Sequence, residues 1–412
     1  MKPTKQSWKM IIPKKIRNST LFSGLLPLFV LAHFAHHLLT ALPVPLLPLI
    51  RENFSLDYTQ AGIVVSVFSL SYGIGQLPAG WLADRIGTRI LLTIGICGVA
   101  VAGLLVGLSQ TYVMMIAFLI LMGLVGGGYH PSASPLISSS IEPKNRGKAL
   151  GYHLIGGGGS FFLSPLIAAA ISSVWGWRGS FITLAIPTMI FGIIFYLLLS
   201  RKGKPTNTKP ILISNTTNSV KISSNPMNLR RLIPFMFLTS FTQAVTFSII
   251  TFIPLFMVDQ FSVSKETAAA SISIIYFAGL WASPLGGYLS DRFGRVPILL
   301  ASCLITGPTI YLLNLTSYGL ASSALLLFLG IIMYIRMPTS ESYIIGQSSE
   351  QRRSTILGIY YFANMEGGGL LTPLMGTFID NLGYYTSFTI AGIAVVSMTF
   401  ICGIFLWGKK DY

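Results

Sequence analysis

The feature that most constrains this chain is a series of twelve apolar segments, each long enough to cross a lipid bilayer as a helix. A membrane-spanning helix needs roughly 20 apolar residues in succession. In hydrocarbon every backbone polar group needs an internal partner, and these segments are too long and too continuous for barrel strands, so we predict helices. The expected fold class is an all-α membrane protein with twelve transmembrane helices. The predicted spans cover residues 21–48, 58–82, 89–108, 112–138, 147–173, 177–200, 231–258, 265–290, 296–316, 318–343, 354–380 and 384–407.

The composition agrees with that of an integral membrane protein. Of the 412 residues, 52% are hydrophobic and 10% are charged, and the mean hydropathy is +0.69. A soluble domain carries about 25% charged residues. The basic segment before residue 21 and the apolar run after it resemble a secretory signal peptide, but the run is too long and eleven more spans follow. We therefore interpret this run as a retained first transmembrane helix.

Lysine and arginine are distributed unevenly between the predicted loops. With the N-terminus inside, the cytoplasmic segments hold 24 of the 28 Lys and Arg residues, the outer loops hold Arg51, Arg178 and Lys265, and Arg336 lies within a span. This positive-inside pattern predicts a multi-pass protein of the cell membrane with both termini in the cytoplasm. Topology and attraction to anionic lipid account for the formal charge of +16, so we expect no nucleic-acid partner.

An internal repeat relates the two parts of the chain at a constant offset of 207 residues. "GWLADRIGTR" at 80–89 aligns with "GYLSDRFGRV" at 287–296, and a polar stretch rich in Lys, Asn, Ser and Thr separates six spans from six. We predict an N-terminal six-helix bundle at 1–200, a cytoplasmic linker at 201–230 and a C-terminal six-helix bundle at 231–412. Six spans is an even number, so the repeats are parallel, and such transporters bind their substrate near the midplane between the halves.

The repeated pattern G-x-x-x-D-R-x-G, followed by Arg, resembles the signature of the major facilitator superfamily, and the resemblance covers the whole chain. It implies two six-helix halves in which the Asp and Arg residues form ion pairs that close the cytoplasmic side in one state. The family pattern ends in two basic residues, whereas each copy here keeps one. The predicted gate residues are Gly80, Asp84, Arg85, Gly87, Arg89, Gly287, Asp291, Arg292, Gly294 and Arg295, together with the aligned pair Arg146 and Arg353.

A narrower resemblance covers the first half. "LAHFAHHLLTALP", "GGGYHPSASPLI" and "GKALGYHLIGGGGSFFLSPLIAA" are similar to segments of the fosmidomycin-resistance-type efflux proteins. That resemblance implies export of a phosphonate-like compound in exchange for protons. The family tends to place an acidic residue near His37, where this chain has histidine. The glycines at 156–159 resemble a degenerate antiporter signature and equally suit close packing between helices.

All five histidines lie within predicted spans, where ionisable groups mark functional sites by default. His33, His36 and His37 share one helix face because their spacing is i, i+3 and i+4, and His130 and His153 lie in two other spans. Three interpretations compete. The cluster couples protons or contacts substrate, since imidazole titrates near pH 6.5. Alternatively it binds a metal with help from His130 or Glu366, or its rings only hydrogen-bond neighbouring helices.

The second half carries the intramembrane acids and the one intramembrane arginine. Glu366 is the leading candidate for proton coupling, together with the histidines, and Glu341 is a second candidate. Arg336 is a candidate for an anionic substrate group, because guanidinium matches carboxylate and phosphonate geometry, and a structural ion pair with either Glu is its alternative. The superfamily resemblance implies that the first, fourth, seventh and tenth spans line the cavity. The remaining predicted cavity residues are His130, His153, Gln243, Thr239 and Thr246.

These observations predict a secondary active transporter. No P-loop, nucleophile elbow, H-E-x-x-H or Cys-rich metal motif is present, and the H-x-x-H-H at 33–37 lacks the further histidine boxes of a membrane di-iron enzyme. We expect no enzyme activity, cofactor or resident metal. The expected partners are a small-molecule substrate, protons and the bilayer, and the expected state is monomeric. Proton-coupled efflux of a small anionic or amphiphilic compound is the leading hypothesis, followed by proton symport of an organic acid or other solute, and then by divalent-metal export.

Overall fold

The computed structural model describes residues 25–141, 145–201, 229–348 and 353–407, and these residues are helical with no β-strand among them. The predicted all-α class is confirmed. The linker predicted at 201–230 lies almost entirely outside the described residues, so the three domain boundaries stay a prediction. The first half contains α2 (Leu26–Thr40), α3 (Leu47–Phe54), α4 (Tyr58–Ile86), α5 (Thr88–Thr93), the π-helical turn η1 (Ile94–Gly98), α6 (Val99–Leu108), α7 (Tyr112–Gly126), α8 (Tyr129–Ser140) and α9 (Arg146–Arg201).

The second half repeats this order with breaks at different places. It contains α10 (Leu229–Phe261), α11 (Lys265–Phe277), the 3₁₀ turn η3 (Ala278–Leu280), α12 (Ala282–Phe293), α13 (Arg295–Leu313), α14 (Leu320–Gln347) and α15 (Arg353–Leu406). By length and composition, eight helices or continuous helix pairs can cross a bilayer, and the bent pair α11–α12 makes a ninth. α9 and α15 each turn back at one glycine and hold two spans. With the shorter apolar α2, the helices match all twelve predicted segments.

The first span is shorter than predicted. The sequence predicts one span over 21–48, whereas α2 ends at Thr40 and a separate short helix, α3, begins at Leu47. Pro43 and Pro45 explain the break, because each lacks a backbone N–H and its ring clashes with the preceding helical turn. The chain between the two helices forms turns instead.

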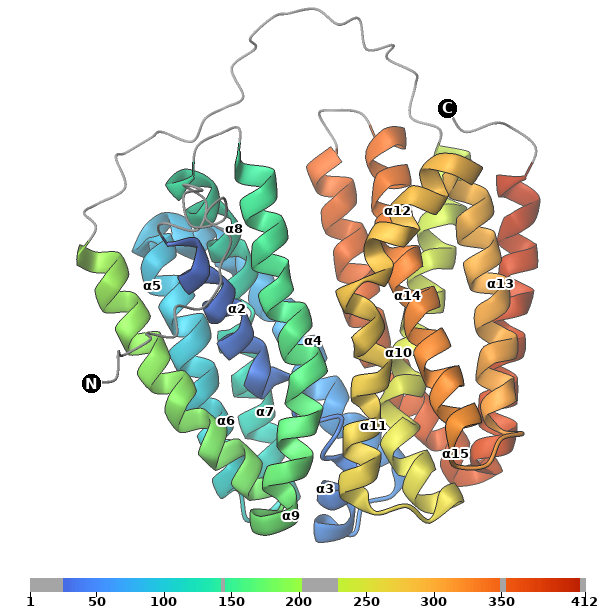
Figure 1. The fold of residues 1–412 in the computed structure, drawn as a ribbon, viewed down its shortest axis with the longest axis horizontal. Helices are drawn as coiled ribbons and strands as arrows, with labels where there is room; N and C mark the ends of the chain where they lie inside the picture. Colours follow the sequence, from blue (N-terminus) through green and yellow to red (C-terminus); the bar gives the residue numbers. More distant parts are fainter. Residues whose placement is uncertain (1–24, 142–144, 202–228, 349–352, 408–412) are drawn as a thin grey trace, which may run out of the picture.

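The two halves stand side by side as two helix bundles, α2–α9 and α10–α15 (Figure 1). Their backbones repeat at the offset of 207 residues found in the sequence. Positive φ angles occur in equivalent pairs: Ser55 with Ser262, Gly87 with Gly294, and Gly176 with Gly383. Helix starts repeat as well, since Asp57 accepts from the Gln60 N–H and Ser264 accepts from the Thr267 N–H. The parallel repeat is therefore a property of the structure as well as of the sequence.

The bundles meet at one end and diverge at the other (Figure 1). At the end that carries α3, which we call the α3 end, Arg51 pairs with Asp259 at 3.2 Å, and Asp380 accepts from the Tyr58 and Thr59 N–H groups at 2.9 Å. At the opposite end, which we call the motif end, α4 and α12 finish at the repeated G-x-x-x-D-R-x-G patterns. The functional side chains lie between these two ends.

Candidate functional site

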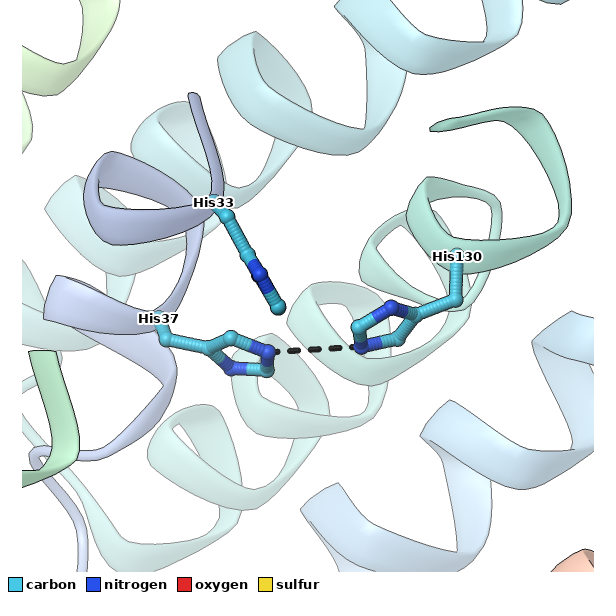
Figure 2. A group of neighbouring side chains, drawn as sticks. All are labelled: His33, His37 and His130. Atoms are coloured by element: carbon cyan, nitrogen blue, oxygen red, sulfur yellow. Dashed lines mark hydrogen bonds between the residues drawn. The ribbon is translucent and has the colours of Figure 1, made fainter. Parts of the chain in front are cut away.

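All five histidines of the chain gather in one cluster inside the first bundle. Three come from α2, His130 comes from α8 and His153 comes from α9. His33 stacks on His153 with ring centroids 4.2 Å apart, and it meets His130 edge-on at 5.1 Å. His37 and His130 approach to 3.3 Å between their Nε2 atoms (Figure 2). The structure thus brings together residues that the sequence places up to 120 positions apart.

Backbone carbonyl groups fix the orientation of three of these rings. The Nδ1–H of His33 donates to the carbonyl of His153 at 2.8 Å, and the Nδ1–H of His153 donates to the carbonyl of Phe29 at 3.0 Å. The Nδ1–H of His36 donates to the carbonyl of Gly95 at 2.9 Å. A neutral imidazole that donates from Nδ1 keeps its lone pair on Nε2. Each of these three rings therefore presents an acceptor nitrogen on its other side.

Two tyrosines that the sequence did not single out complete the cluster. The hydroxyl of Tyr72, from α4, donates to Nε2 of His36 at 3.0 Å, so both nitrogens of His36 have partners. Tyr129, from α8, stacks on His36 with ring centroids 4.3 Å apart. Tyr129 directly precedes His130 in the sequence, which is the signal that could have pointed to it. Tyr72 gives no such signal, because an isolated tyrosine in an apolar helix is ordinary.

The glycine-rich stretch of α9 provides the close packing that the cluster needs. A Cβ at Gly156 would lie 2.1 Å from the carbonyl oxygen of Val30, and one at Gly157 would lie 2.5 Å from Cε1 of His33. Both contacts are too short for any side chain, so these two glycines allow α2 to lie directly against α9. This arrangement supports the close-packing interpretation of the glycines at 156–159.

The second half places a buried arginine where the first half has an aromatic ring. Arg336, from α14, is only 2% exposed, and its Nη2 donates to Oε1 of Gln243 at 2.6 Å. Its Nη1 is buried and has no hydrogen-bond partner. Among the described residues no carboxylate forms an ion pair with this guanidinium, so the predicted alternative of a structural pair with Glu341 or Glu366 is not formed. At the offset of 207, Arg336 corresponds to Tyr129, and Gln243 corresponds to His36.

Glu366 lies at the contact between the two halves. It extends from α15 to α4, where the Ser69 hydroxyl donates to its Oε2 at 3.4 Å. A Cβ at Gly73 would lie 2.2 Å from the carboxyl carbon of Glu366, so this carboxyl group rests on the backbone of α4. Ser69, Tyr72 and Gly73 follow one another on one face of α4. The carboxyl group of one half therefore lies beside the tyrosine that contacts the histidine cluster of the other half.

The other predicted residues of the second half have hydrogen-bond partners within that half. Glu341 is partly exposed and hydrogen-bonds Tyr361. Thr239 is buried and shares a hydrogen bond of 2.9 Å with Ser340, and Thr246 is buried and donates to the carbonyl of Thr242 at 2.7 Å. In this conformation Thr239 joins α10 to α14, Thr246 bonds within α10, and the substrate contact of both threonines stays a prediction.

The repeated motif residues lie at the motif end, where the bundles diverge. Asp84, Arg85, Asp291 and Arg292 are exposed, and within the part of the chain that the structure describes none of them forms an ion pair with the other half. Arg85 stacks over Trp81, and Arg292 donates to the hydroxyl of Tyr288 at 3.0 Å. A closing role for these residues stays a prediction that this open conformation leaves untested.

The remaining motif residues have local roles in the structure. Gly87 and Gly294 adopt φ angles of +92° and +93°, which favour glycine, and they end α4 and α12. A Cβ at Gly80 or Gly287 would meet no atom within 4 Å. Arg146 donates to the carbonyl of Ile141 at 3.3 Å, Nη1 of Arg295 lies beside Gly346, and Arg89 is partly buried. The side chain of Arg353 lies outside the described residues.

A polar network at the α3 end is the functional feature that the sequence did not predict. Asp259 accepts from Arg51 and, at 2.6 Å, from the Tyr58 hydroxyl, while Lys265 pairs with Glu52. Asp380 occupies the start of α4 by accepting from two backbone N–H groups and from the Thr59 hydroxyl. These contacts join the halves across more than 200 residues of sequence. Each residue alone looks like an ordinary loop charge, so only the folded chain identifies them as a group.

Comparison with known proteins defines the class to which this arrangement belongs. The model of the Major Facilitator Superfamily matches residues 29–256 and again residues 235–411. The chain belongs to the Major Facilitator Superfamily. Transporters of this superfamily are not enzymes, in agreement with the expectation from the sequence.

Several curated relatives are named as a transporter or as multidrug resistance proteins. The chain is 26% identical to "Multidrug resistance protein MdtG" of Proteus mirabilis (strain HI4320) over 84% of this chain and 87% of the relative, and 27% identical to the Escherichia fergusonii protein of that name over 86% and 88%. It is 26% identical to the "Probable L-galactonate transporter" of Escherichia coli (strain K12) over 63% of this chain. The alignment spans 60% of that relative's length.

Solved structures show the same fold. A bacterial homolog of the human lysosomal transporter Spinster, in an inward-facing and occupied conformation, superposes with a TM-score of 0.77 at 16% identity, over 93% of this chain and 95% of that chain. A D-xylose–proton symporter superposes with a TM-score of 0.76 at 16% identity, over 93% and 97%. The twelve-helix architecture of two repeats is therefore that of the superfamily.

Proposed function

We propose that this protein is a proton-coupled exporter of a small anionic compound, working by alternating access across the cytoplasmic membrane. The observation that carries the proposal is the guanidinium of Arg336, which is 2% exposed, has no carboxylate partner among the described residues and has a buried Nη1 without a hydrogen bond. A buried cation costs several kcal/mol unless something compensates it. A substrate carboxylate or phosphonate supplies that compensation, because it can accept two parallel hydrogen bonds from one guanidinium.

The relatives support an anionic or amphiphilic substrate and the outward direction. Those from Proteus mirabilis and Escherichia fergusonii are named for multidrug resistance, and the one from Escherichia coli is named for L-galactonate, which is a carboxylate anion. The resemblance of the first half to fosmidomycin-resistance-type proteins points to phosphonates. We therefore place phosphonates and sugar acids first among candidate substrates.

Coupling to protons runs through Glu366 in this proposal. Its carboxyl group lies on the contact between the halves, beside Ser69 and Gly73, and Tyr72 on the same face of α4 contacts the histidine cluster. Any relative movement of the two halves changes the surroundings of a carboxyl group placed there. When Glu366 is protonated it carries no charge and can stay between the bundles. When Glu366 loses the proton, its negative charge favours separation of the bundles.

The conformation described here fits one state of that cycle. The positive-inside pattern assigns the motif end to the cytoplasm and the α3 end to the outside. The cross-bundle network of Arg51, Asp259 and Asp380 then closes the outer side, while the bundles diverge toward the cytoplasm. This state is ready to load substrate from the cytoplasm, and the motif residues are expected to pair across the halves when the outer side opens.

The test uses everted membrane vesicles from cells that express the protein. Respiration acidifies the vesicle interior, and a pH-sensitive dye reports proton release on addition of fosmidomycin, other phosphonates or sugar acids. We expect fluorescence recovery with the wild type and none with Glu366→Gln, which cannot exchange a proton. Glu341→Gln compares the second candidate: Glu341 contacts Tyr361 within its own half, so in this proposal the variant should retain most of the recovery.

A second variant keeps the test decisive if Glu366→Gln is poorly produced. In Gly73→Ala the new methyl group would lie 2.2 Å from the Glu366 carboxyl carbon, so the carboxyl group must move away while its chemistry is unchanged. We expect strongly reduced coupling. Full recovery in both variants, with an unchanged pH dependence, would remove Glu366 from the mechanism.

The alternative is uptake of an organic acid by proton symport with the same residues. The specific observation in its favour is the name of the Escherichia coli relative, which specifies a sugar acid without a drug. The same vesicle experiment separates the two directions. An antiporter moves protons out of the acidified interior on addition of substrate, whereas a symporter shows no such recovery and instead acidifies intact cells when substrate is added outside.

A further inference from the structure

Three histidine side chains converge on one point inside the first bundle. His33 and His37 project from successive turns of α2, and His130 projects toward them from α8 (Figure 2). One ring nitrogen from each of the three lies within 4.8 Å of the others. His33 and His37 are buried, and His130 is partly exposed. The group is therefore shielded on one side and accessible from the other.

The distances are close to those of a transition-metal site. A zinc ion at about 2.0–2.1 Å from each imidazole nitrogen holds neighbouring nitrogens roughly 3.4 Å apart. The Nε2 atoms of His37 and His130 are already 3.3 Å apart. The third nitrogen lies within 4.8 Å of these two and has to move closer when an ion binds. The hydrogen bond between His37 and His130 uses an Nε2 lone pair that an ion would need. The hydrogen bond and the bound ion therefore exclude each other.

The surroundings prepare these rings to be ligands. His33 donates its Nδ1–H to the carbonyl of His153, and His37 has its Nδ1 3.0 Å from the Thr40 hydroxyl. Metal-ligating histidines characteristically donate their other ring N–H to a carbonyl, carboxylate or water, which fixes the tautomer and the ring orientation. The stacking of His153 on His33 adds a further restraint. The lone pair of His33 is thereby left on Nε2, the nitrogen that remains available to an ion.

The ligand types select the class of ion. Three neutral imidazoles without a carboxylate suit late first-row divalent metals and disfavour Mg²⁺ and Ca²⁺, which require oxygen ligands. We propose that His33, His37 and His130 form a binding site for such a metal, with Zn²⁺ as the reference ion and a fourth position open on the exposed side of His130. This goes beyond the proposed function, which uses Glu366 for protons and Arg336 for the substrate and gives the histidines no ligand.

All three ligands belong to one bundle, which makes the proposal independent of transport. α2 and α8 lie in the first half, so the site does not depend on how the two bundles are arranged. Metal binding should therefore persist in Glu366→Gln even if that variant does not transport. A failure of the metal proposal and a failure of proton coupling are thus separate results.

The test is metal binding to the full-length protein, purified in detergent with an affinity tag that contains no histidine. We expect one Zn²⁺ per chain by calorimetry, and a visible absorption band of four-coordinate geometry when Co²⁺ is the probe. Replacing either His37 or His130 by Gln should lower the affinity by at least roughly tenfold to a hundredfold, the loss usual even for second-shell changes. Thermal unfolding of each variant checks that it is folded.

His36→Gln is the matched control. His36 lies on the same helix face, but both of its nitrogens are occupied, by Gly95 and by Tyr72, so it has no lone pair to offer a metal. The corresponding position of the second half already carries Gln243. We expect this variant to bind Zn²⁺ as the wild type does. Absence of stoichiometric binding in the folded wild type, or equal binding by the wild type and the His37→Gln, His130→Gln double variant, would overturn the proposal.

Discussion

The two halves of this transporter share a backbone but differ in the side chains that face its centre. Their special backbone positions occur in pairs at one offset, from Ser55 and Ser262 to Gly176 and Gly383. At the functional positions the same offset pairs His36 with Gln243 and Tyr129 with Arg336. The first half thus presents imidazole and aromatic rings, and the second half presents a guanidinium and the carboxyl group of Glu366.

This comparison shows which residues the fold dictates and which are free to specialise. A turn at positive φ admits few residue types whatever the protein transports. The centre of each bundle tolerates any group that finds a partner, and the partners differ: backbone carbonyls orient the histidines, whereas the side chain of Gln243 accepts from Arg336. In our proposals metal binding belongs to the first half, whereas anion recognition by Arg336 and the proton-coupling carboxyl group of Glu366 belong to the second.

The largest expected effect comes from giving Arg336 a carboxylate partner within the second half. Gln243→Glu places a carboxylate at the position that now lies 2.6 Å from Nη2 of Arg336, and the resulting ion pair should remove the affinity for anionic substrates. A hydrogen bond to a charged group contributes about 1.5–3 kcal/mol, so we expect KM to rise roughly tenfold to a hundredfold. The measurement is concentration-dependent dye recovery in vesicles. Gln243→Met, which adds no charge, is the control, and equal transport by both variants would exclude Arg336 from anion binding.

A change at the paired turns tests whether the backbones are equivalent. Gly176 and Gly383 have φ angles of +66° and +72° with extended ψ, and a Cβ at either would meet no atom within 4 Å. Alanine at each position should therefore cost strain alone, about 1–3 kcal/mol, and by similar amounts. Thermal unfolding in detergent measures this, with Gly158→Ala in the helical part of α9 as the unstrained control. A large difference between the two variants would argue against equivalent turns.

A smaller effect is expected at the link between the halves. Tyr72→Phe removes the hydroxyl that donates to Nε2 of His36 and leaves that buried nitrogen without a partner. We expect a several-fold slower coupled transport with Zn²⁺ binding unchanged, because His36 is not a metal ligand. Tyr112→Phe removes a comparable bond, from the Tyr112 hydroxyl to the carbonyl of Gln60, near the α3 end and serves as the control. Wild-type rates in Tyr72→Phe would show that the link is only structural.

The smallest effect belongs to the network at the α3 end. Asp259→Asn weakens the contact with Arg51, whose side chain is 28% exposed, and such pairs contribute about 0–1 kcal/mol. We expect a modest shift toward the outward-open state. The labelling rate of a cysteine at Thr377, in a background without the three native cysteines, reports it, because Thr377 meets Thr59 across the halves. Arg51→Met should give the same shift and the double variant no more, whereas additive shifts would separate the two residues.

Most of the fold could be predicted from the sequence, because span length and a constant repeat offset are properties of the chain itself. The exception is the first span, where the effect of Pro43 and Pro45 outweighed an apolar run that continues to residue 50. Hydropathy alone does not register that interruption, since proline is tolerated in many membrane helices. The backbone restriction imposed by proline predicts the end of this helix better than hydropathy does.

The site could be predicted only in part. Ionisable residues inside spans identified the histidines, Arg336 and Glu366, because each carries an energetic cost that marks it. Tyr72, Tyr129 and the residues that join the halves at the α3 end carry no such mark, and their roles come from neighbours more than 30 residues away. Sequence reasoning ranked metal binding low because one helix face cannot surround an ion. The sequence offered His130 or Glu366 as the further ligand, and the structure places His130, from α8, beside His33 and His37.

The single-glycine turns at Gly176 and Gly383 also keep the chain short at the α3 end, which the topology that we propose places outside the cell. On the α3 side the chain between described helices is only a few residues long, as at 55–57, 109–111 and 262–264, and the longest connections are 41–46 and 314–319. Proteases cleave extended segments of chain, and antibodies bind segments that protrude from the surface. We therefore expect intact cells that carry this transporter to be resistant to external trypsin and poorly recognised by antisera, and 314–319 to be the position where an external epitope tag is best accepted.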